Sequence, residues 1–309
     1  MNKPLLLKIH RWITLVFAIP LFAIILTGLI LAFEPLVQLD GINALALDET
    51  RVVDLIKQYD PEGKARGVAI SAAARRLTLQ GLNVPPIDLV TGEPVTATSG
   101  MADLFVWARR THERLLDQSW LVTGSTAAMI VIMSLGILMG LPRLRNSLAG
   151  WHKGAAWLTL PLIFLSPLTG LCLALGLTFQ GGPPAASAGR ISLADAVHVV
   201  SQTRDLSHVI SIGSRGGRLM LRTFENGELR AYAVGAEGIV ALPRNWPRLI
   251  HEGNWSAKIA APLDILTSVV LLGLLATGLL LWSSRKWRRA PARQPQTGRR
   301  SVGAVASDS

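Results

Sequence analysis

The chain contains little cysteine and little charge. Cys172 is the single cysteine among 309 residues, and only 17% of the residues are charged, whereas an ordinary soluble domain has about 25%. One thiol excludes an internal disulfide framework, a Cys-rich zinc site, an iron–sulfur cluster and CxxCH haem attachment. No GxGxxG loop with a following acidic residue is present, which argues against a built-in NAD or flavin domain. Because half of the residues are hydrophobic, the composition predicts a membrane protein with part of its chain in water.

Four apolar stretches are long enough to cross a bilayer, for which about 20 residues suffice. The first has a longer apolar core than a signal peptide, no cleavage site follows it, and Glu34-Pro35 ends it, so we expect it to be retained as a helix. The expected spans are residues 12–33, 121–141, 155–179 and 261–282.

The basic residues are concentrated in three of the segments between and beyond these spans. Residues 1–11, 142–154 and 283–309 together carry 13 basic residues and one acidic residue, Asp308. The long loops at 34–120 and 180–260 are almost neutral. The positive-inside rule therefore places both termini in the cytoplasm and both long loops in the periplasm of a bacterial inner membrane. This orientation accounts for the basic charge without nucleic-acid binding. The tail at 283–309 is rich in Pro, Arg, Gln, Ser and Gly, and we expect it to be disordered.

Both long loops have a mixed α/β pattern. Asn226-Gly227 lies between alternating apolar runs, which is a strong hairpin signal, and Ser192 is a suitable helix N-cap. We therefore expect four transmembrane helices in a duplicated helix–loop–helix arrangement, with two small α+β loops. The expected helices are 51–59 and 191–203, and the expected strands are 67–71, 87–95, 209–212, 219–224 and 229–234.

The two halves of the chain repeat a histidine-led pattern. His10-Arg11 is followed by Thr27-Gly28, and His152-Lys153 is followed by Thr169-Gly170; in both halves the threonine comes 17 residues after the histidine. The second and fourth spans are preceded by His112-Glu113 and His251-Glu252. Four of the six histidines thus fall at the ends of the four spans, two on each side of the membrane.

Two neutral imidazoles that face each other in a helix bundle can form a bis-histidine site for haem iron. We expect two haem b groups, with His10 and His152 as axial ligands of one and His112 and His251 as axial ligands of the other. Zinc or copper usually takes three or four ligands, although Glu113 and Glu252 leave a metal alternative open on the periplasmic side. Taken one at a time, such histidines are more often simple membrane-boundary anchors.

Further residues fit a haem site. Arg11 and Lys153 are candidate partners for haem propionates. Gly28 and Gly170 lie about 27 Å along a helix from their cytoplasmic histidines, level with the periplasmic pair, where they could let the macrocycle approach or simply allow close helix packing. His112 and His251 precede their spans by about nine residues, so a continuous helix would lift that pair about 13 Å above the hydrocarbon.

Lys8-Ile-His10-Arg11-Trp12, together with Thr27-Gly28 and Glu34-Pro35, resembles the PepSY-associated transmembrane family. Asp88-Leu-Val-Thr-Gly-Glu93 is similar to the strand–turn of PepSY domains. The resemblance covers roughly residues 5–285. It implies haem-dependent electron transfer toward the periplasm, because the family includes inner-membrane ferric-siderophore reductases. Both loops are short for the family, and Gly235-Ala-Glu-Gly238 replaces the second T-G-E turn.

The leading hypothesis is therefore an electron-transfer oxidoreductase that reduces a ferric siderophore, or another periplasmic acceptor, with a quinol or a cytoplasmic reductase as donor. Periplasmic arginines could steer anionic ferric chelates. The alternative is a non-enzymatic PepSY module that binds or restrains a periplasmic partner. A transporter is disfavoured because Asp264 alone approaches an intramembrane ionisable position.

Overall fold

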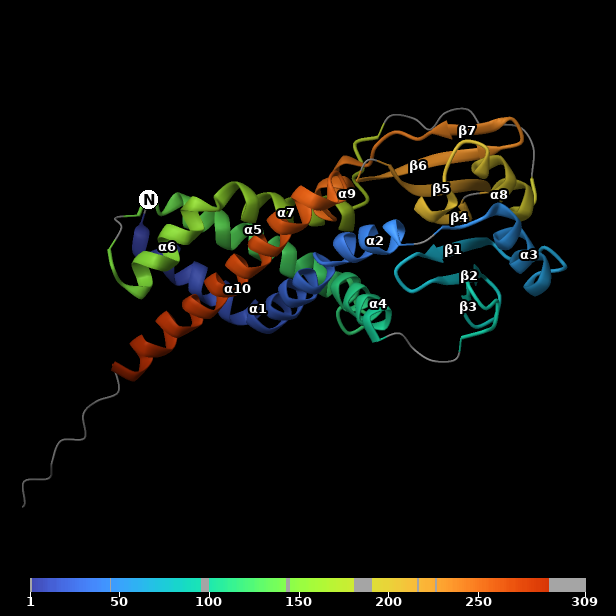
Figure 1. Cartoon of the computed structure of the whole chain (residues 1–309). Helices are drawn as coiled ribbons and strands as arrows, with labels where there is room; N and C mark the ends of the chain where they lie inside the picture. Colours follow the sequence, from blue (N-terminus) through green and yellow to red (C-terminus); the bar gives the residue numbers. More distant parts are fainter. Residues whose placement is uncertain are drawn as a thin grey trace, which may run out of the picture.

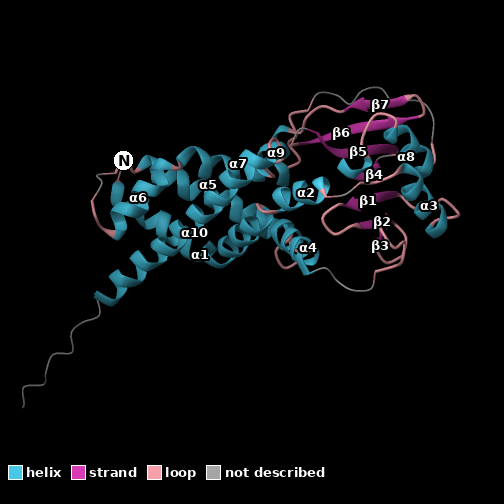
Figure 2. Ribbon diagram, in the orientation of Figure 1, coloured by secondary structure: helices cyan, strands magenta, loops and turns pink. Residues whose placement is uncertain are grey.

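The computed structural model describes residues 2–44, 46–95, 100–142, 145–180, 191–215, 217–225 and 227–288. The molecule is elongated, with a helical bundle at one end and a β-sheet with its covering helices at the other (Figures 1 and 2). The N-terminus lies at the end of the bundle far from the sheet, and we call this the terminal end. The opposite end of the bundle, next to the sheet, is the sheet end.

The first span is helix α1, Lys3–Leu31, and a second helix, α2, follows at Glu34–Asn43. The expectation that Glu34-Pro35 ends a helix holds for α1, but a new helix begins at the same dipeptide. The N–H groups of the first helical turn have no acceptor within the helix, so proline, which lacks an N–H, is favoured there. Pro35 lies at this position of α2. Helix α2 therefore extends the first span from the bundle toward the sheet.

In the described parts of the chain, three helices are long and apolar enough to cross a membrane, namely α1 with its extension α2, α5 (Ser119–Leu138) and α10 (Ala257–Arg288). A fourth span exists if α6 (Leu148–Leu158) and α7 (Leu160–Ala174) are taken together; they meet at an angle of 66°. The sequence predicts a single span at 155–179 here. Pro161 explains the bend, because its ring removes a backbone donor and clashes with the preceding turn.

The basic tail differs in part from expectation. Helix α10 continues to Arg288, so residues 283–288 are helical rather than disordered. The rest of the expected disordered tail, 289–309, lies outside the described residues.

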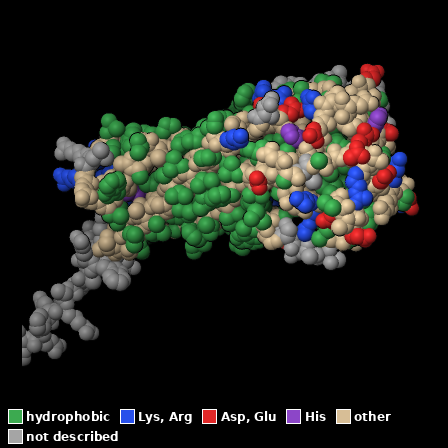
Figure 3. Space-filling view, viewed as in Figure 1, with side chains coloured by type: hydrophobic (Ala, Val, Ile, Leu, Met, Phe, Trp, Pro, Cys, Tyr) green, Lys and Arg blue, Asp and Glu red, His purple; other side chains and the backbone are tan. Residues whose placement is uncertain are grey.

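The bundle exposes apolar side chains around its outside, as Figure 3 shows on one face. On α1 alone, Trp12, Val16 and Ile19 are more than half exposed. A soluble protein rarely exposes apolar surface on this scale, whereas a bilayer covers it at no cost. Charged side chains gather instead around the sheet. The bundle core is formed by Leu21, Ile25, Met129, Ile163, Leu271 and Leu275.

The sheet has seven antiparallel strands in the order β3-β2-β1-β4-β5-β6-β7. The first long loop provides three strands and the second provides four. Their bounds are β1 Gly67–Ser71, β2 Arg76–Gln80, β3 Ile87–Asp88, β4 Val209–Arg215, β5 Arg218–Glu225, β6 Glu228–Gly235 and β7 Gly238–Ala241.

Pairing of β1 with β4 joins the two loops into one sheet, where the sequence predicts two small units. Val68 pairs with Ile212, and Gly67 pairs with Gly213. Either loop alone would leave a strand edge with unpaired backbone groups, and pairing the two edges satisfies both. A Cβ on Gly67 would lie only 2.5 Å from the Cα of Gly213, so glycine allows this close approach.

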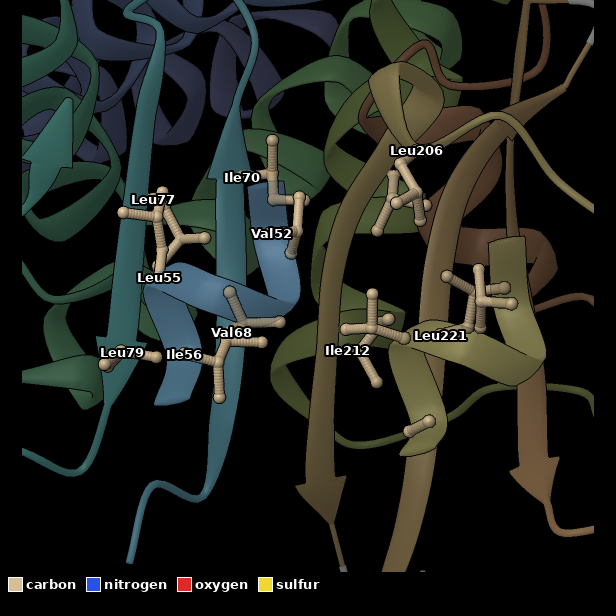
Figure 4. Packing of buried hydrophobic residues seen from close by; sticks show 14 of the residues in the cluster. Val52, Leu55, Ile56, Val68, Ile70, Leu77, Leu79, Leu206, Ile212 and Leu221 are labelled. Carbon is tan, nitrogen blue, oxygen red and sulfur yellow. The ribbon is translucent and has the colours of Figure 1, made fainter. Parts of the chain in front are cut away.

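Helices α3 (Glu49–Tyr59) and α8 (Leu193–Ser201) cover one face of the sheet (Figure 4). Ser192 caps α8 by accepting a hydrogen bond from the Asp195 N–H, as predicted. Glu225 pairs with Glu228, which confirms the predicted hairpin, although Asn226 itself lies outside the described residues. The shared core includes Val52, Leu55, Val68, Leu77, Val197, Ile212 and Leu221.

The expected strand at 87–95 is mostly a turn. Strand β3 contains only Ile87 and Asp88, and the Asp88 carboxylate then accepts hydrogen bonds of 2.8 Å from the N–H groups of Val90 and Thr91. Gly92 follows with φ +82°, a conformation that favours glycine. Arg51 and Tyr59 of α3 donate hydrogen bonds to the carbonyl groups of this turn.

Candidate functional site: two histidine pairs in the helical bundle

Two short helices bring a pair of histidines together at the sheet end of the bundle. Helix α4 (Gly100–Glu113) packs against α1 and carries His112; helix α9 (Trp246–His251) packs against α7 and carries His251. The two imidazole ring centres are 6.0 Å apart, and the ring planes are tilted by 37°. The second half of the chain thus reproduces the arrangement of the first.

The sequence predicts a gap between these histidines and the hydrocarbon, and the fold removes it. Helix α4 is not an extension of α5, because Leu116 and Asp117 adopt positive φ angles of 54° and 60° and turn the chain between the two helices. Gly253, at φ +64°, lies in the corresponding turn between α9 and α10. His112 therefore lies beside Ile24 and Thr27 of α1, inside the bundle.

The same nitrogen is engaged in both histidines. Nδ1 of His112 is 2.9 Å from the Ile24 carbonyl oxygen and 3.2 Å from Thr27 Oγ1. Nδ1 of His251 is 3.0 Å from the Ser166 carbonyl oxygen and 3.3 Å from Thr169 Oγ1. Because a carbonyl oxygen only accepts, each Nδ1 carries the proton and donates, and Nε2 keeps its lone pair.

Both histidines are held neutral. Burial is the larger cause and the neighbouring His251 the next largest of a lowering of the pKa of His112 to about 4. Burial also lowers the pKa of His251. At neutral pH both rings therefore present an unprotonated Nε2, the form that binds a metal.

Gly28 and Gly170 lie against these rings. A Cβ on Gly28 would come within 3.1 Å of Cε1 of His112, and one on Gly170 within 2.9 Å of Cε1 of His251. The predicted level of the two glycines agrees with the structure. They leave room for the histidine rings, a more specific role than close helix–helix packing.

The second pair lies at the terminal end of the bundle. Nδ1 of His10, on α1, is 3.0 Å from the Ile132 carbonyl oxygen of α5, and Nδ1 of His152, on α6, is 2.8 Å from Thr277 Oγ1 of α10. Thr277 Oγ1 donates to the Gly273 carbonyl oxygen and can therefore accept from His152. All four histidines thus use Nδ1 to contact the protein.

The flanking cations and acids differ in their contacts. Arg11 is half-buried beside His10, and Lys153 is exposed beside His152. At the sheet end, Arg109 forms an ion pair with Glu34. Glu252 forms an ion pair of 3.0 Å with Arg248 and accepts a 2.8 Å hydrogen bond from Asn254.

These contacts bear on the metal alternative. Within the described parts of the chain, no group of three or more His, Cys, Asp or Glu side chains could hold a metal ion. Glu252 is engaged with Arg248 and Asn254, and Glu113 is exposed. Each histidine pair is therefore a two-ligand arrangement.

The sequence pattern identifies the four histidines, the two glycines, and Thr27 and Thr169 beside them, but it does not assign these threonines as hydrogen-bond partners and it misses the other partners. Thr277 was overlooked, although Thr277-Gly278 repeats the Thr-Gly dipeptide of α1 and α7. The partners Ile24, Ile132 and Ser166 act through backbone carbonyl groups, and a side-chain pattern does not mark those.

Apolar helices that expose hydrophobic side chains, together with a polar antiparallel sheet, define a membrane protein with a domain in water. The chain matches the family model of the PepSY-associated TM region over residues 7–285. It belongs to this family, as the sequence resemblance predicts. No curated protein matches the chain.

Proposed function

We propose that this protein is a haem-dependent transmembrane electron carrier that reduces ferric siderophores on the sheet side of the bacterial inner membrane. The observation that carries the proposal is the common state of four paired histidines. Each holds Nδ1 to the protein and leaves Nε2 with a free lone pair. Hydrogen bonding at the non-ligating nitrogen is the usual way in which a metal-binding imidazole is oriented.

The sheet-end pair has the donor set that a haem would need. The ring centres of His112 and His251 are 6.0 Å apart, and these two histidines would hold the group together. A porphyrin supplies its own four equatorial nitrogens, so two histidines suffice where zinc would require more ligands. Under this proposal, His10 and His152 would hold one haem b, and His112 and His251 would hold the other.

Bound haem would supply one-electron exchange at each end of the bundle. The chain's own residues orient the imidazoles, keep them neutral and leave space for their rings through Gly28 and Gly170. Arg11 and Lys153 are placed next to His10 and His152, where they can neutralise propionates. The ferric ion of the chelate gains one electron and becomes ferrous, which weakens its hold on hard oxygen ligands. No protein group needs to transfer a proton.

The proposed orientation has both termini in the cytoplasm and the sheet in the periplasm, because the N-terminal basic segment and the described parts of the basic segments 142–154 and 283–309 lie at the terminal end. A quinol or a cytoplasmic reductase is the proposed electron donor. A reporter inserted near Gly63 should be active only in the periplasm, and a reporter fused after Arg289 only in the cytoplasm. The opposite pattern of reporter activity would mean that the proposed orientation, and with it the proposed direction of electron flow, is reversed.

Visible spectroscopy of the purified full chain tests the cofactor. We expect a sharp, redox-sensitive b-type spectrum with two haems per chain, and about half of that content in His10→Ala. His208→Ala is the control, since its Nδ1 lies 3.1 Å from the Phe224 carbonyl oxygen, in the sheet. Unchanged haem content in His10→Ala combined with His112→Ala would refute the assignment.

Stopped-flow mixing tests the acceptor. Chemically reduced protein should be reoxidised by a ferric siderophore, and His251→Ala should slow this step. Haem that remains reduced for minutes with every ferric chelate would leave electron transfer in place but reject these acceptors.

The second candidate is a non-enzymatic module that binds or restrains a periplasmic partner. The joined sheet favours it, because seven paired strands form a stable platform that electron transfer does not require. Such a protein would purify without haem.

A further inference from the structure

A small cavity lies where the sheet meets helix α9, outside both histidine pairs. Its volume is about 90 Å³, and strands β5 and β6, the segment 242–245 and α9 contribute to its walls. This is far below the roughly 300–1,000 Å³ of pockets that enclose drug-sized ligands. The cavity therefore suits a compact molecule or a single polar group.

Among the described residues, four arginines and one carboxylate, Glu228, line this cavity, and Glu252 pairs with one of the arginines from outside it. Arg230 and Arg244 both bind Glu228, at 3.2 Å and 2.7 Å. Arg248 binds Glu252. The fourth arginine, Arg222, has no side-chain hydrogen bond and no ion pair within 4.0 Å in the part of the chain that the structure describes. The local charge is therefore positive. The four lining arginines are Arg222, Arg230, Arg244 and Arg248.

Arg222 is held in this position by the strand on which it lies. It shares a face of β5 with Phe224, which packs against Ile42 of α2, so this face is turned toward the helical bundle. Burial lowers the pKa of Arg222, while Glu252 and Glu34 act in the opposite direction from a distance. A half-buried guanidinium without a close partner carries a desolvation cost that a bound anion would offset.

The remaining polar groups of the cavity favour an acceptor-rich ligand. Both carboxylate oxygens of Glu228 already accept from Arg244. Asn245 uses its Oδ1 to accept from the Arg248 N–H, which leaves its amide N–H groups as donors. Guanidinium groups bind carboxylates and phosphates with two parallel hydrogen bonds. The lining also includes Gln180 and Asn254, whose side-chain N–H groups donate to the Pro243 carbonyl oxygen and to Glu252. The guanidinium donors and the positive charge of the walls disfavour a cationic ligand.

We propose that this cavity, centred on Arg222, is a binding site for a phosphate or carboxylate group. The group can belong to a small soluble anion or to an anionic lipid headgroup, since only the short turn 252–256 separates α9 from the membrane helix α10. The site does not depend on haem, and it differs from the histidine pairs in its residues and its chemistry.

Titration calorimetry of the full chain in lipid-free detergent tests the site, with inorganic phosphate and citrate as probes at constant ionic strength. Wild type should bind at least one probe saturably, and Arg222→Gln should bind at least tenfold more weakly. Arg114→Gln is the matched control, because it removes the same charge from an exposed residue that does not line the cavity. Arg222→Lys keeps the positive charge and should retain part of the affinity. This result would show that loss of charge, rather than misfolding, weakens binding in Arg222→Gln.

Two further arms identify the source of the anion and separate this site from the proposed electron transfer. In nanodiscs, phosphatidylglycerol should compete with the probes if the occupant is a lipid, and should have no effect beyond phosphatidylcholine if it is soluble. His251→Ala should retain probe binding even where haem is lost. The proposal would be overturned if neither probe bound saturably and phosphatidylglycerol showed no Arg222-dependent retention. It would also be overturned if Arg222→Gln and Arg114→Gln bound the probes equally well.

Discussion

The two ends of the bundle use the repeated sequence differently. At the sheet end the halves are close copies: His112 and His251 each lie on a short helix, contact a carbonyl oxygen and a threonine, and cover a glycine. At the terminal end His10 contacts a backbone carbonyl alone, whereas His152 contacts a threonine side chain. The comparison shows that a duplicated motif keeps its geometry where both copies use the same supporting residues.

The long loops show a second outcome of duplication. Each loop folds as a helix followed by antiparallel strands, α3 with β1 to β3 and α8 with β4 to β7, and the two join through β1 and β4 into one sheet. A helix can bury its apolar side against a neighbouring helix of its own half, but a strand edge needs a partner strand. The predictions below test both contrasts, in order of decreasing expected effect.

The largest effect is expected from filling the space beside a sheet-end histidine. Gly170→Leu places side-chain atoms where the His251 ring lies, and should remove the sheet-end haem, about half of the total. Gly136→Leu is the matched control, because a Cβ on Gly136 meets no atom within 4 Å. Haem content per chain is the measurement, and equal content in both variants would contradict the role of Gly170.

The junction of the two loops should be sensitive on one strand only. Gly67→Ala forces a Cβ against the backbone of Gly213 and should cost about 1–3 kcal/mol of stability, the usual range for overpacking. A Cβ on Gly213 would come closest to the flexible side chain of Gln80, at 3.2 Å, and would reach the backbone of Arg66 and Gly67 only at 3.6 Å, an ordinary van der Waals distance, so Gly213→Ala should be tolerated. Chemical unfolding followed by near-UV circular dichroism measures the difference. Equal midpoints would show that the β1–β4 pairing contributes little.

The two ends should respond differently to loss of a threonine. Thr277→Val removes the hydrogen-bond partner found for His152 Nδ1, and should speed haem loss from that end about tenfold, at the lower limit for such supporting residues. Thr169→Val leaves the Ser166 carbonyl oxygen with His251 and should have a smaller effect. Haem transfer to excess apomyoglobin gives both rates. A larger effect of Thr169→Val would reverse the comparison.

The smallest effect is expected at the turn after β3. Asp88→Ala removes two hydrogen bonds to backbone N–H groups and should lower stability by about 1 kcal/mol; Val90→Ala, at an exposed side chain, is the control. The hydrogen bond from Thr91 also holds the pKa of Asp88 below its ordinary value. The stabilisation by the ionised Asp88 carboxylate is therefore fully present above the ordinary pKa of aspartate. It is lost as the pH falls through the lower pKa of the folded protein. Urea titrations of both variants near pH 7 and at acid pH measure it.

Much of the architecture follows from local sequence. The apolar runs predict the helices because about 20 residues must satisfy their backbone within the bilayer, and Ser192 and Asn226-Gly227 mark a helix start and a hairpin through short-range chemistry. The repeat pairs His10 with His152 and His112 with His251. These features depend on residues close together in the chain, or on a pattern repeated along it.

Tertiary structure decided the remaining features. The bend between α6 and α7, the return of α4 along α1 and the pairing of β1 with β4 each depend on contacts between distant segments. The carbonyl groups of Ile24, Ile132 and Ser166 belong to no side-chain pattern, and packing alone presents them to the histidines. Arg222 is one ordinary arginine among many in the sequence. Its position in a cavity with three other arginines arises because β5, β6 and α9 converge there, and local sequence does not encode that convergence.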